Sequence, residues 1–346
     1  AEAKSIQSSY FFDQQNLIVS SFCDKKVLFL GEASHGDGAA FAFKVDLVRR
    51  LIDDCQFNVF INESGIYDFL RLQQRLENNL EIDRRMIADG IGPVWSTANE
   101  YAPMLEFLLQ RIKKGSLHLT GMDDQISAGS WASTGEMATE LTGYLGNSNQ
   151  KTCESTIQRY LLWQYSNELP YTEAQQSLVL QCLREIKLRI SQSTRPSRTR
   201  EFHSLMAESL HRKVSRDFIS TRDDQFNSRD LSMYLNFARL RSIYPSDTKF
   251  IVWTHNIHAA KHLSSVEGYE SRHSTGERIY SEFGESSASL GLTAYSGSYA
   301  MRGSLPREIG VARQGSLEWH AFEGRDQELH YLESKELKRL GTINGR

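Results

Sequence analysis

The stretch V-L-F-L-G-E-A-S-H-G, from Val27 to Gly36, decides the fold. Four apolar residues between Lys26 and Gly31 are typical of a short buried strand, and the apolar residues after Gly36 recur with the period of a helix. A strand that ends in a tight turn and leads into a helix is the repeating unit of parallel α/β sheets. The stretch therefore predicts an α/β protein.

The turn that follows this strand carries three reactive side chains. Glu32, Ser34 and His35 place a carboxylate, a hydroxyl and an imidazole within four residues. The carboxyl end of a strand is where open α/β sheets bind their ligands. Ser34 is also a good helix N-cap, and Glu32 would be an ordinary solvated turn residue. The turn alone leaves a structural and a catalytic interpretation open.

Three further apolar runs end in ionisable residues in the same way. They are Asn58 to Asn62 before Glu63, Leu117 to Met122 before Asp123 and Asp124, and Phe250 to Trp253 before Thr254, His255 and His258. Because parallel strands end at the same edge of a sheet, we expect these carboxylates and histidines to share one site with His35.

The order of strands and helices predicts the organisation of the chain. We expect a mainly parallel sheet flanked by helices, built from residues 1–129 and 245–346. Residues 130–244 contain long helical periods and no strand, so they predict a helical subdomain covering the carboxyl edge of the strands. Within it, Ser191 to Arg200 is expected to form an exposed basic loop.

Composition narrows the classes of partner. The chain has 346 residues, a formal net charge of -3 and no apolar run near the roughly 18 residues that span a bilayer. We expect no nucleic-acid and no membrane partner, and the oligomeric state stays open. The start Ala1-Glu2-Ala3-Lys4 is compatible with a mature secreted or periplasmic protein and with a cloning scar on a cytoplasmic one.

Four cysteines are scattered along the chain without a C-x-x-C spacing, which argues against a zinc ribbon or a thioredoxin-type site. They are Cys23, Cys55, Cys153 and Cys182. Buried free thiols are the favoured state. For an exported protein three disulfide pairings exist, and the sequence does not choose among them.

The absence of several known catalytic motifs argues against the reactions that depend on them. Gly31 to Gly36 has one residue too many before its serine to be a nucleophile elbow, and no G-x-S-x-G occurs elsewhere. H-E-x-x-H and the phosphate-binding glycine patterns are absent. His258 and His262 stand at helical spacing, so metal binding with nearby carboxylates remains an alternative. Histidine with carboxylate otherwise indicates general-base activation of water.

Seven short motifs, spread in order over residues 26 to 300, resemble the erythromycin esterase family. They are L-G-E-A-S-H-G from Leu30 to Gly36, E-S-G from Glu63 to Gly65, V-W-S from Val94 to Ser96 followed by Asn99-Glu100, G-M-D from Gly121 to Asp123, R-D-x-x-M-x-x-N from Arg229 to Asn236, V-W-T-H-N-x-H from Val252 to His258, and Y-S-G from Tyr295 to Gly297.

The resemblance implies hydrolysis of a small-molecule carboxylic ester or macrolactone by an activated water, with no covalent enzyme intermediate, no cofactor and no metal. His35 matches the proposed general base, Glu32 and Glu63 match the carboxylates beside it, and His255 and His258 match the late histidine motif. The residues expected to bind substrate are Ser34, Trp95, Asp123, Arg229, Met233 and Asn236.

One departure from the family pattern concerns substrate choice. Gly38 and Ala39 stand where family members often carry an Arg-Glu pair, so hydrolysis of macrolides and a role in antibiotic resistance do not follow from the resemblance. Two alternatives stay open. One is a metal-dependent hydrolase or a metal- or haem-binding protein, and the other is a catalytically silent small-molecule-binding domain.

Overall fold

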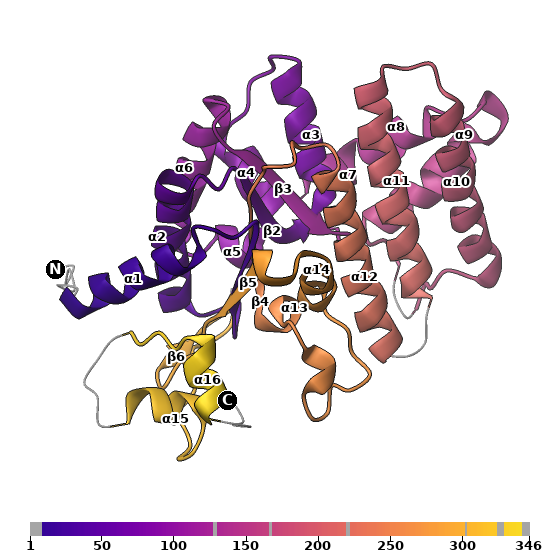
Figure 1. Ribbon diagram of the computed structural model, residues 1–346. Coiled ribbons are helices and arrows are strands. Elements are labelled where there is room, and N and C mark those ends of the chain that lie inside the picture. Colours follow the sequence, from indigo (N-terminus) through magenta and orange to yellow (C-terminus); the bar gives the residue numbers. More distant parts are fainter. Residues whose placement is uncertain are drawn as a thin grey trace.

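The centre of the computed structural model is a parallel sheet of five strands in the order β3-β2-β4-β1-β5 (Figure 1). The structure describes residues 9–126, 130–165, 168–218, 222–301, 303–323 and 329–340. The strands are β1 (Val27–Glu32), β2 (Val59–Gly65), β3 (His118–Asp123), β4 (Phe250–His255) and β5 (Ser287–Gly291). The predicted α/β fold class is confirmed.

Four of these strands are the four predicted apolar runs, whereas β5 was not predicted. Its sequence S-A-S-L-G has one large apolar residue, Leu290, and pairs in parallel with β1 from Val27 to Gly31. It is buried less completely than the other strands, and its sequence carries no apolar run.

The helices fall into three sequence groups. The first is α1 (Ser9–Phe22), α2 (Gly38–Cys55), α3 (Ile66–Glu77), α4 (Arg84–Ile91), α5 (Pro93–Ser96) and α6 (Ala102–Lys113). The second, here called the helical block, is α7 (Trp131–Gly135), α8 (Met137–Thr142), α9 (Asn147–Leu161), α10 (Glu173–Gln192), α11 (Ser197–Asp217) and α12 (Arg222–Arg241). The third is α13 (Asn256–Ala259), α14 (Thr275–Phe283), α15 (Leu317–Phe322) and α16 (Ser334–Leu340), with the 3-10 turns η1 (Leu263–Ser265) and η2 (Gly284–Ser286) and the hairpin of β6 (Ser298–Tyr299) and β7 (Arg307–Glu308). Within the described ranges, no helix has the length and apolar character needed to cross a bilayer.

Alternation along β1 divides the core into two layers. Leu28 and Leu30 pack with α1, α2, α4 and α6, whereas Val27 and Phe29 pack with residues of α12 and α14 on the opposite face. Both faces of the sheet are thus covered by helices, as a parallel sheet requires (Figure 1).

The helical block has its own apolar core and lies on the β3 side of the sheet (Figure 1). Two adjacent carboxylates at the end of β3 join it to the sheet. Asp124 pairs through both oxygens with Arg216 of α11, and Asp123 pairs with Arg229 of α12. The last helix of the block thereby reaches the carboxyl edge of the strands.

The expected basic loop from Ser191 to Arg200 is wrong in its extent. Helix α10 continues to Gln192 and α11 begins at Ser197, so only residues 193–196 lie outside the helices. Pro196 is the N-cap residue of α11.

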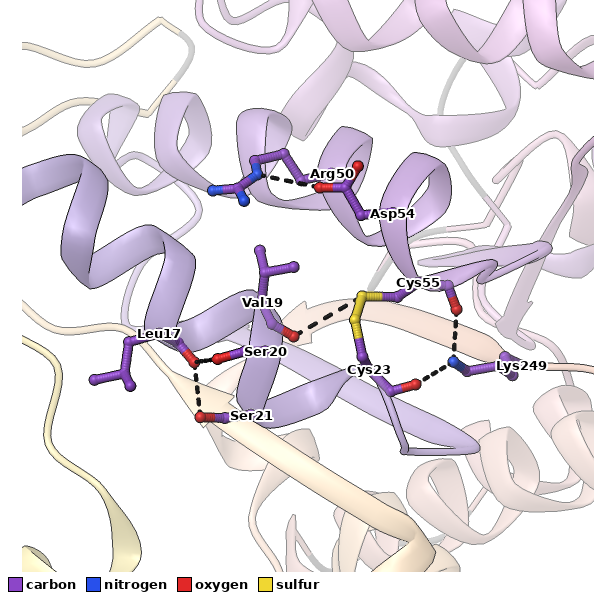
Figure 2. Close-up of a disulfide and its surroundings, with 9 residues drawn as sticks. All are labelled: Leu17, Val19, Ser20, Ser21, Cys23, Arg50, Asp54, Cys55 and Lys249. Carbon is purple, nitrogen blue, oxygen red and sulfur yellow. Dashed lines mark hydrogen bonds and ion pairs between the residues drawn. A yellow bond between two sulfur atoms is a disulfide. The ribbon is translucent and has the colours of Figure 1, made fainter.

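The expectation of free thiols is also wrong. Cys23 pairs with Cys55 and Cys153 pairs with Cys182. Figure 2 shows the first bridge, which joins the ends of α1 and α2, with Lys249 donating to the carbonyl oxygens of both cysteines. The sequence did not reveal these pairs because helix packing, and not local spacing, brings the cysteines together.

Candidate active site

The turn between β1 and α2 is held against two other segments of the chain. A Cβ atom on Gly31 would lie 2.2 Å from Oδ1 of Asn256, and one on Gly36 would lie 2.7 Å from the carbonyl oxygen of Ala300. The Ala300 amide also donates to the Gly36 carbonyl at 3.1 Å. These glycines let the C-terminal third of the chain close directly onto the turn.

His35 is held in one tautomer by Glu32. Its Nδ1 lies 2.8 Å from Oε1 of the Glu32 carboxylate, which is completely buried. An ionised carboxylate only accepts hydrogen bonds, so Nδ1 carries the proton and the neutral ring keeps its lone pair on Nε2. The imidazole is partly exposed and packs edge-on against Trp95, with the ring centroids 4.9 Å apart. His35 is therefore set up to accept a proton.

Glu32 is buried among donors that keep it ionised. Lys44 donates to Oε2 at 2.5 Å, and the Trp95 indole donates to Oε1 at 2.8 Å. Burial raises the pKa of Glu32, but Lys44, His35 and Trp95 together outweigh burial and lower it below the ordinary value. Burial lowers the pKa of Lys44 to about 8 against the opposing charge of Glu32. With the pKa of Glu32 lowered and that of Lys44 at about 8, the two side chains form an ion pair at neutral pH.

Lys44 is a site residue that sequence reasoning missed, although the sequence contains a signal. It stands three residues after Phe41 and four before Val48, within the apolar stripe of α2, and its side chain is fully buried. Its ammonium also lies 4.0 Å from the centre of the Trp253 ring. A lysine on the core face of a helix requires a buried counter-ion, which here is Glu32.

A second charged cluster forms where β2, β3, β4 and α12 meet. Arg229 donates to Glu63 at 2.9 Å and to Asp123 at 2.5 Å. His258 lies between Glu63 and Asp230, 3.3 Å from the first and 2.9 Å from the second. Asp230 was not among the predicted site residues, although it adjoins Arg229 in the motif of α12. Glu63, Asp123, Asp230 and His258 are buried, and the Arg229 side chain is 21% exposed.

Protonation of His258 follows from its neighbours. Burial alone would lower its pKa, but Glu63 and Asp230 raise the pKa to about 9. The Arg229 Nη1 atom lies 3.1 Å from Nε2 of His258, a distance that would suit a hydrogen bond only to a neutral ring. Because two carboxylates flank the ring, we assign a protonated His258 whose Nε2 donates to Glu63, with Arg229 as a neighbouring cation. Burial raises the pKa of Glu63, but His258 and then Arg229 outweigh burial and hold that pKa well below its usual value.

His255 lies between the pair of Glu32 and His35 and the buried charged cluster. Its backbone amide donates to Glu63 at 2.8 Å, and its ring lies 5.4 Å from that of His35. Nε2 donates to the Ala33 carbonyl at 3.0 Å, and Nδ1 accepts from the Ile257 amide at 3.2 Å. Burial, followed by the nearby His35, lowers the pKa of His255, so its ring is neutral.

A cleft of about 1020 Å³ opens beside this turn. Ser34, His35 and His255 lie at one part of its wall, and exposed residues of α2 form another. The C-terminal segment contributes the opposite wall, which includes Leu292, Tyr295, Tyr299, Met301, Ile309, Phe322 and Leu329. Of the predicted site residues, Ser34, His35 and His255 thus line the cleft, while Glu32 and Trp95 lie directly behind His35.

The remaining predicted residues lie elsewhere. Glu63, Asp123, Arg229 and His258 form the buried cluster behind His255 and do not line the cleft. Two others are fully buried between α12 and its neighbours. Met233 packs in the core beneath β1 and β2, and Asn236 donates to the Met122 carbonyl and to Ser209. The structure does not bring Met233 or Asn236 to the cleft.

The histidine, cysteine and carboxylate side chains that the structure describes bear on the metal alternative. Among them, no group of three histidine, cysteine, aspartate or glutamate residues is placed to hold a metal ion. His258 faces Glu63 and Asp230, whereas the ring of His262 packs edge-on against Tyr280. His258 and His262, which the sequence suggested as a metal-binding pair, therefore lie in separate environments.

The structure thus places a histidine held by a buried carboxylate at the carboxyl edge of a parallel α/β sheet, an arrangement that can activate water. The sequence profile of the erythromycin esterase family matches residues 52–332. The chain belongs to the erythromycin esterase family. The match begins after Glu32 and His35, so the assignment of these two residues rests on the motif and on the geometry above.

Individual relatives are distant. The chain is 23% identical over 300 residues to the protein named "Putative hydrolase YbfO" of Bacillus subtilis (strain 168), a match that covers 79% of this chain and 66% of that protein. A succinoglycan biosynthesis protein of known structure has a TM-score of 0.69 at 14% identity, covering 91% of this chain and 79% of its own. A mutant of the erythromycin esterase EreC in its open conformation has a TM-score of 0.61 at 17% identity, covering 89% and 82%. At these identities the structural matches establish the fold.

Proposed function

We propose that the protein hydrolyses a carboxylic ester or macrolactone, with His35 activating water as a general base. The observation that carries this proposal is the geometry of His35. Its Nδ1 is bound to a buried, ionised Glu32, and the ring lines a large cleft with its second nitrogen available. A neutral imidazole in this tautomer is the usual proton acceptor in water activation.

The proposed reaction uses one histidine twice. Nε2 of His35 takes a proton from a water molecule as the water oxygen bonds to the ester carbonyl carbon, and the carbonyl oxygen becomes an oxyanion. The tetrahedral intermediate then collapses, the bond between carbon and leaving oxygen breaks, and the proton passes from His35 to that oxygen. The products are the acid and the alcohol, and the enzyme returns to its starting state.

The Glu32 carboxylate and its partners would act as positioning groups. When His35 is protonated, an ionised acceptor at Nδ1 stabilises the imidazolium, as a buried carboxylate does in other histidine-based hydrolases. Lys44 and Trp95 hold Glu32 in that state and orientation. Glu32, Lys44 and Trp95 would therefore act on the reaction through His35 and not through contact with substrate.

The oxyanion needs a donor at the cleft wall. Ser34 accepts a hydrogen bond from the Gly36 amide at 3.2 Å, which leaves its hydroxyl proton for the substrate carbonyl. His255 offers a second N–H at Nε2. To bind the substrate, this N–H would have to exchange its hydrogen bond to the Ala33 carbonyl for one to the oxyanion. We propose Ser34 as the first donor and His255 as the second.

The buried charged cluster would fix His255 in place. Glu63 accepts from both the Thr254 hydroxyl and the His255 amide, and Arg229 and His258 keep Glu63 ionised. We therefore assign Glu63, Asp123, Arg229 and His258 positioning roles at the end of β4. A substrate-binding role for Met233 and Asn236 has no support in their location.

Hydrolysis of a panel of esters and macrolactones, each measured with and without a chelator, tests this proposal. Turnover that persists with chelator supports water activation by His35. Turnover abolished by chelator would instead favour the metal-dependent alternative. A ligand that raises the melting temperature without any turnover across the panel would favour a silent binding domain.

We also propose that the protein works in an oxidising compartment. Both pairs of cysteines form disulfides, and such bonds persist mainly in exported proteins. Thiol titration of protein isolated under alkylating conditions tests this, and free thiols on all four cysteines would contradict it.

A further inference from the structure

A second depression, of about 380 Å³, lies in the helical block where α11 packs between α10 and α12 (Figure 1). It is bounded by the last turn of α10, the first turns of α11 and the last turn of α12, and the structure describes all of these segments. Its volume falls within the roughly 300–1,000 Å³ that is usual for small-molecule sites. The polar residues that line it are Ser191, Ser197, Arg200, Glu201, Ser204 and Arg239.

Two guanidinium groups and one carboxylate give this depression its charge. The guanidinium groups belong to Arg200, which is half-buried, and to Arg239, which is exposed. The Glu201 carboxylate already accepts from Arg198 at 3.2 Å, and Arg198 also donates to Glu77 at 3.0 Å. The described residues supply no carboxylate partner for either Arg200 or Arg239. The carboxylate of the lining is thus paired, whereas its two cations are not.

Arg200 differs from the other arginines of its helix. Its Nε atom is buried, and no described residue accepts a hydrogen bond from any of its guanidinium nitrogens. By contrast, Arg198, Arg212 and Arg216 of α11 all donate to side-chain acceptors. Buried polar groups nearly always have a partner, and a half-buried cation without one is costly unless an anion binds there. The unpaired donors of Arg200 therefore indicate an acceptor that the chain itself does not supply.

The serine hydroxyls differ in how far they are already engaged. Ser191 donates to the Leu188 carbonyl at 2.7 Å, and Ser204 donates to Glu208 at 2.9 Å, so both act mainly as wall. Ser197 precedes Arg200 by three residues, a spacing that places the two side chains side by side on α11. Its hydroxyl can therefore donate to a ligand that Arg200 binds.

We propose that this depression is a binding site for a phosphate group, held by Arg200 and Arg239 with Ser197 as a hydroxyl donor. Arginine binds phosphate oxygens through pairs of N–H donors, and two guanidinium groups match the charge of a phosphate dianion. The depression exceeds the size of one phosphate, so an attached small organic group fits as well. Arg239 lies ten residues beyond Arg229 on α12, roughly 15 Å along the helix. The site is thus separate from the cleft at His35 and does not depend on the proposed hydrolysis.

Calorimetric titration of the full chain tests the proposal with inorganic phosphate, glycerol 3-phosphate and uncharged glycerol as probes. Both phosphates are expected to bind and glycerol is not, and added sodium chloride should weaken the binding of both phosphates. Tighter binding of glycerol 3-phosphate than of inorganic phosphate identifies an organic phosphate as the preferred ligand, and equal affinity identifies the free ion.

Three variants locate the binding. Arg200→Gln should raise the Kd of the phosphate probes about 10-fold or more, because a half-buried guanidinium loses its charge-assisted hydrogen bonds to the ligand. Arg239→Gln changes an exposed side chain and should raise the Kd about two- to fivefold. Arg189→Gln is the matched control, since it removes the same charge from the last turn of α10 outside the depression. Its Kd should equal that of the wild type.

The opposite results would overturn the proposal. If the wild type binds neither phosphate, no such site exists. If Arg200→Gln and Arg239→Gln bind phosphate as tightly as the wild type, or all three variants weaken binding equally, the protein attracts an adventitious ion only. If Arg200→Gln does not fold, Arg239→Gln and Arg189→Gln decide by the same comparison of Kd values.

Discussion

The proposed chemistry depends strongly on Glu32, which acts only through His35. It does not touch the cleft, yet it fixes the tautomer of His35 and is itself held by Lys44 and Trp95. A fully buried carboxylate is stable in its ionised form only with such partners. Removing one partner should therefore change both stability and proton transfer.

Replacement of Lys44 tests this dependence. Lys44→Met leaves the Glu32 carboxylate buried without its cation, which should lower the free energy of unfolding by about 3–5 kcal/mol. The pKa of Glu32 should rise, so the acid limb of the kcat/KM profile should move to higher pH. Chemical denaturation and pH–rate profiles measure the two effects. Lys44→Arg keeps the charge and is the control; an acid limb in Lys44→Met that matches the wild type would contradict the role of Lys44.

Single residues show where sequence reasoning succeeded and where it could not. Topology alone predicted that the side chains after the strands lie at one edge of the sheet, and their roles in a site stay predictions. Lys44 was missed because its apolar neighbours suggested only a core face. Met233 and Asn236 share a helix with Arg229, but the packing of α12 turns them toward the core, which the sequence does not encode locally.

At the scale of elements, four segments meet through charge. Glu63 lies near the carboxyl end of β2, and Asp123 is the last residue of β3. Arg229 and Asp230 belong to α12, and His258 follows β4. The apolar contacts of α12 attach the helix to the sheet, and these ion pairs fix its register against the strand ends.

The charged cluster predicts a pH dependence of stability. The pKa of His258 is raised in the folded protein to about 9 from the ordinary value of 6.5. Its stabilising contribution is therefore fully present below pH 6.5 and is lost as pH rises through 9. The loss is on the order of 3 kcal/mol by the linkage relation.

Urea unfolding of the wild type and His258→Gln at pH 6 and at about pH 9.5 measures this contribution. The difference in unfolding free energy between the two proteins should be large at pH 6 and small at the higher pH. Comparing the two proteins at each pH removes the titration of Lys44 and of other groups. A difference that does not change with pH would mean that His258 is neutral in the folded protein.

Elements also show the limits of prediction from sequence. Strong apolar runs located β1 to β4, whereas β5 lacks such a run and was not predicted. The polar run after Ser191 was interpreted as a loop, but most of it is helical because α10 and α11 pack through residues on either side of it.

At the scale of the whole molecule, the sheet supports the cleft from one side and the C-terminal segment closes it from the other. The disulfides lie away from the cleft, one at the ends of α1 and α2 and one between α9 and α10. Their contribution is therefore to stability and not to catalysis.

The disulfide between Cys153 and Cys182 tests whether the bridges affect stability and not catalysis. The paired residues are 29 positions apart, and the double variant Cys153→Ser, Cys182→Ser should lose about 3–4 kcal/mol of unfolding free energy through the entropy of the unfolded chain. Its kcat/KM at a temperature where it is folded should equal that of the wild type. Free thiols at these positions in the native wild-type protein would contradict the pairing.

The central claim is that His35 is the general base. The most direct measurement is the rate of ester hydrolysis by the wild type, His35→Ala and the control His262→Ala, each with and without chelator and added imidazole. We expect His35→Ala to remain folded and to lose about 10² to 10⁴ in rate, to recover part of it with imidazole, and all rates to be indifferent to chelator. A folded His35→Ala that hydrolyses the ester at the wild-type rate would contradict this account.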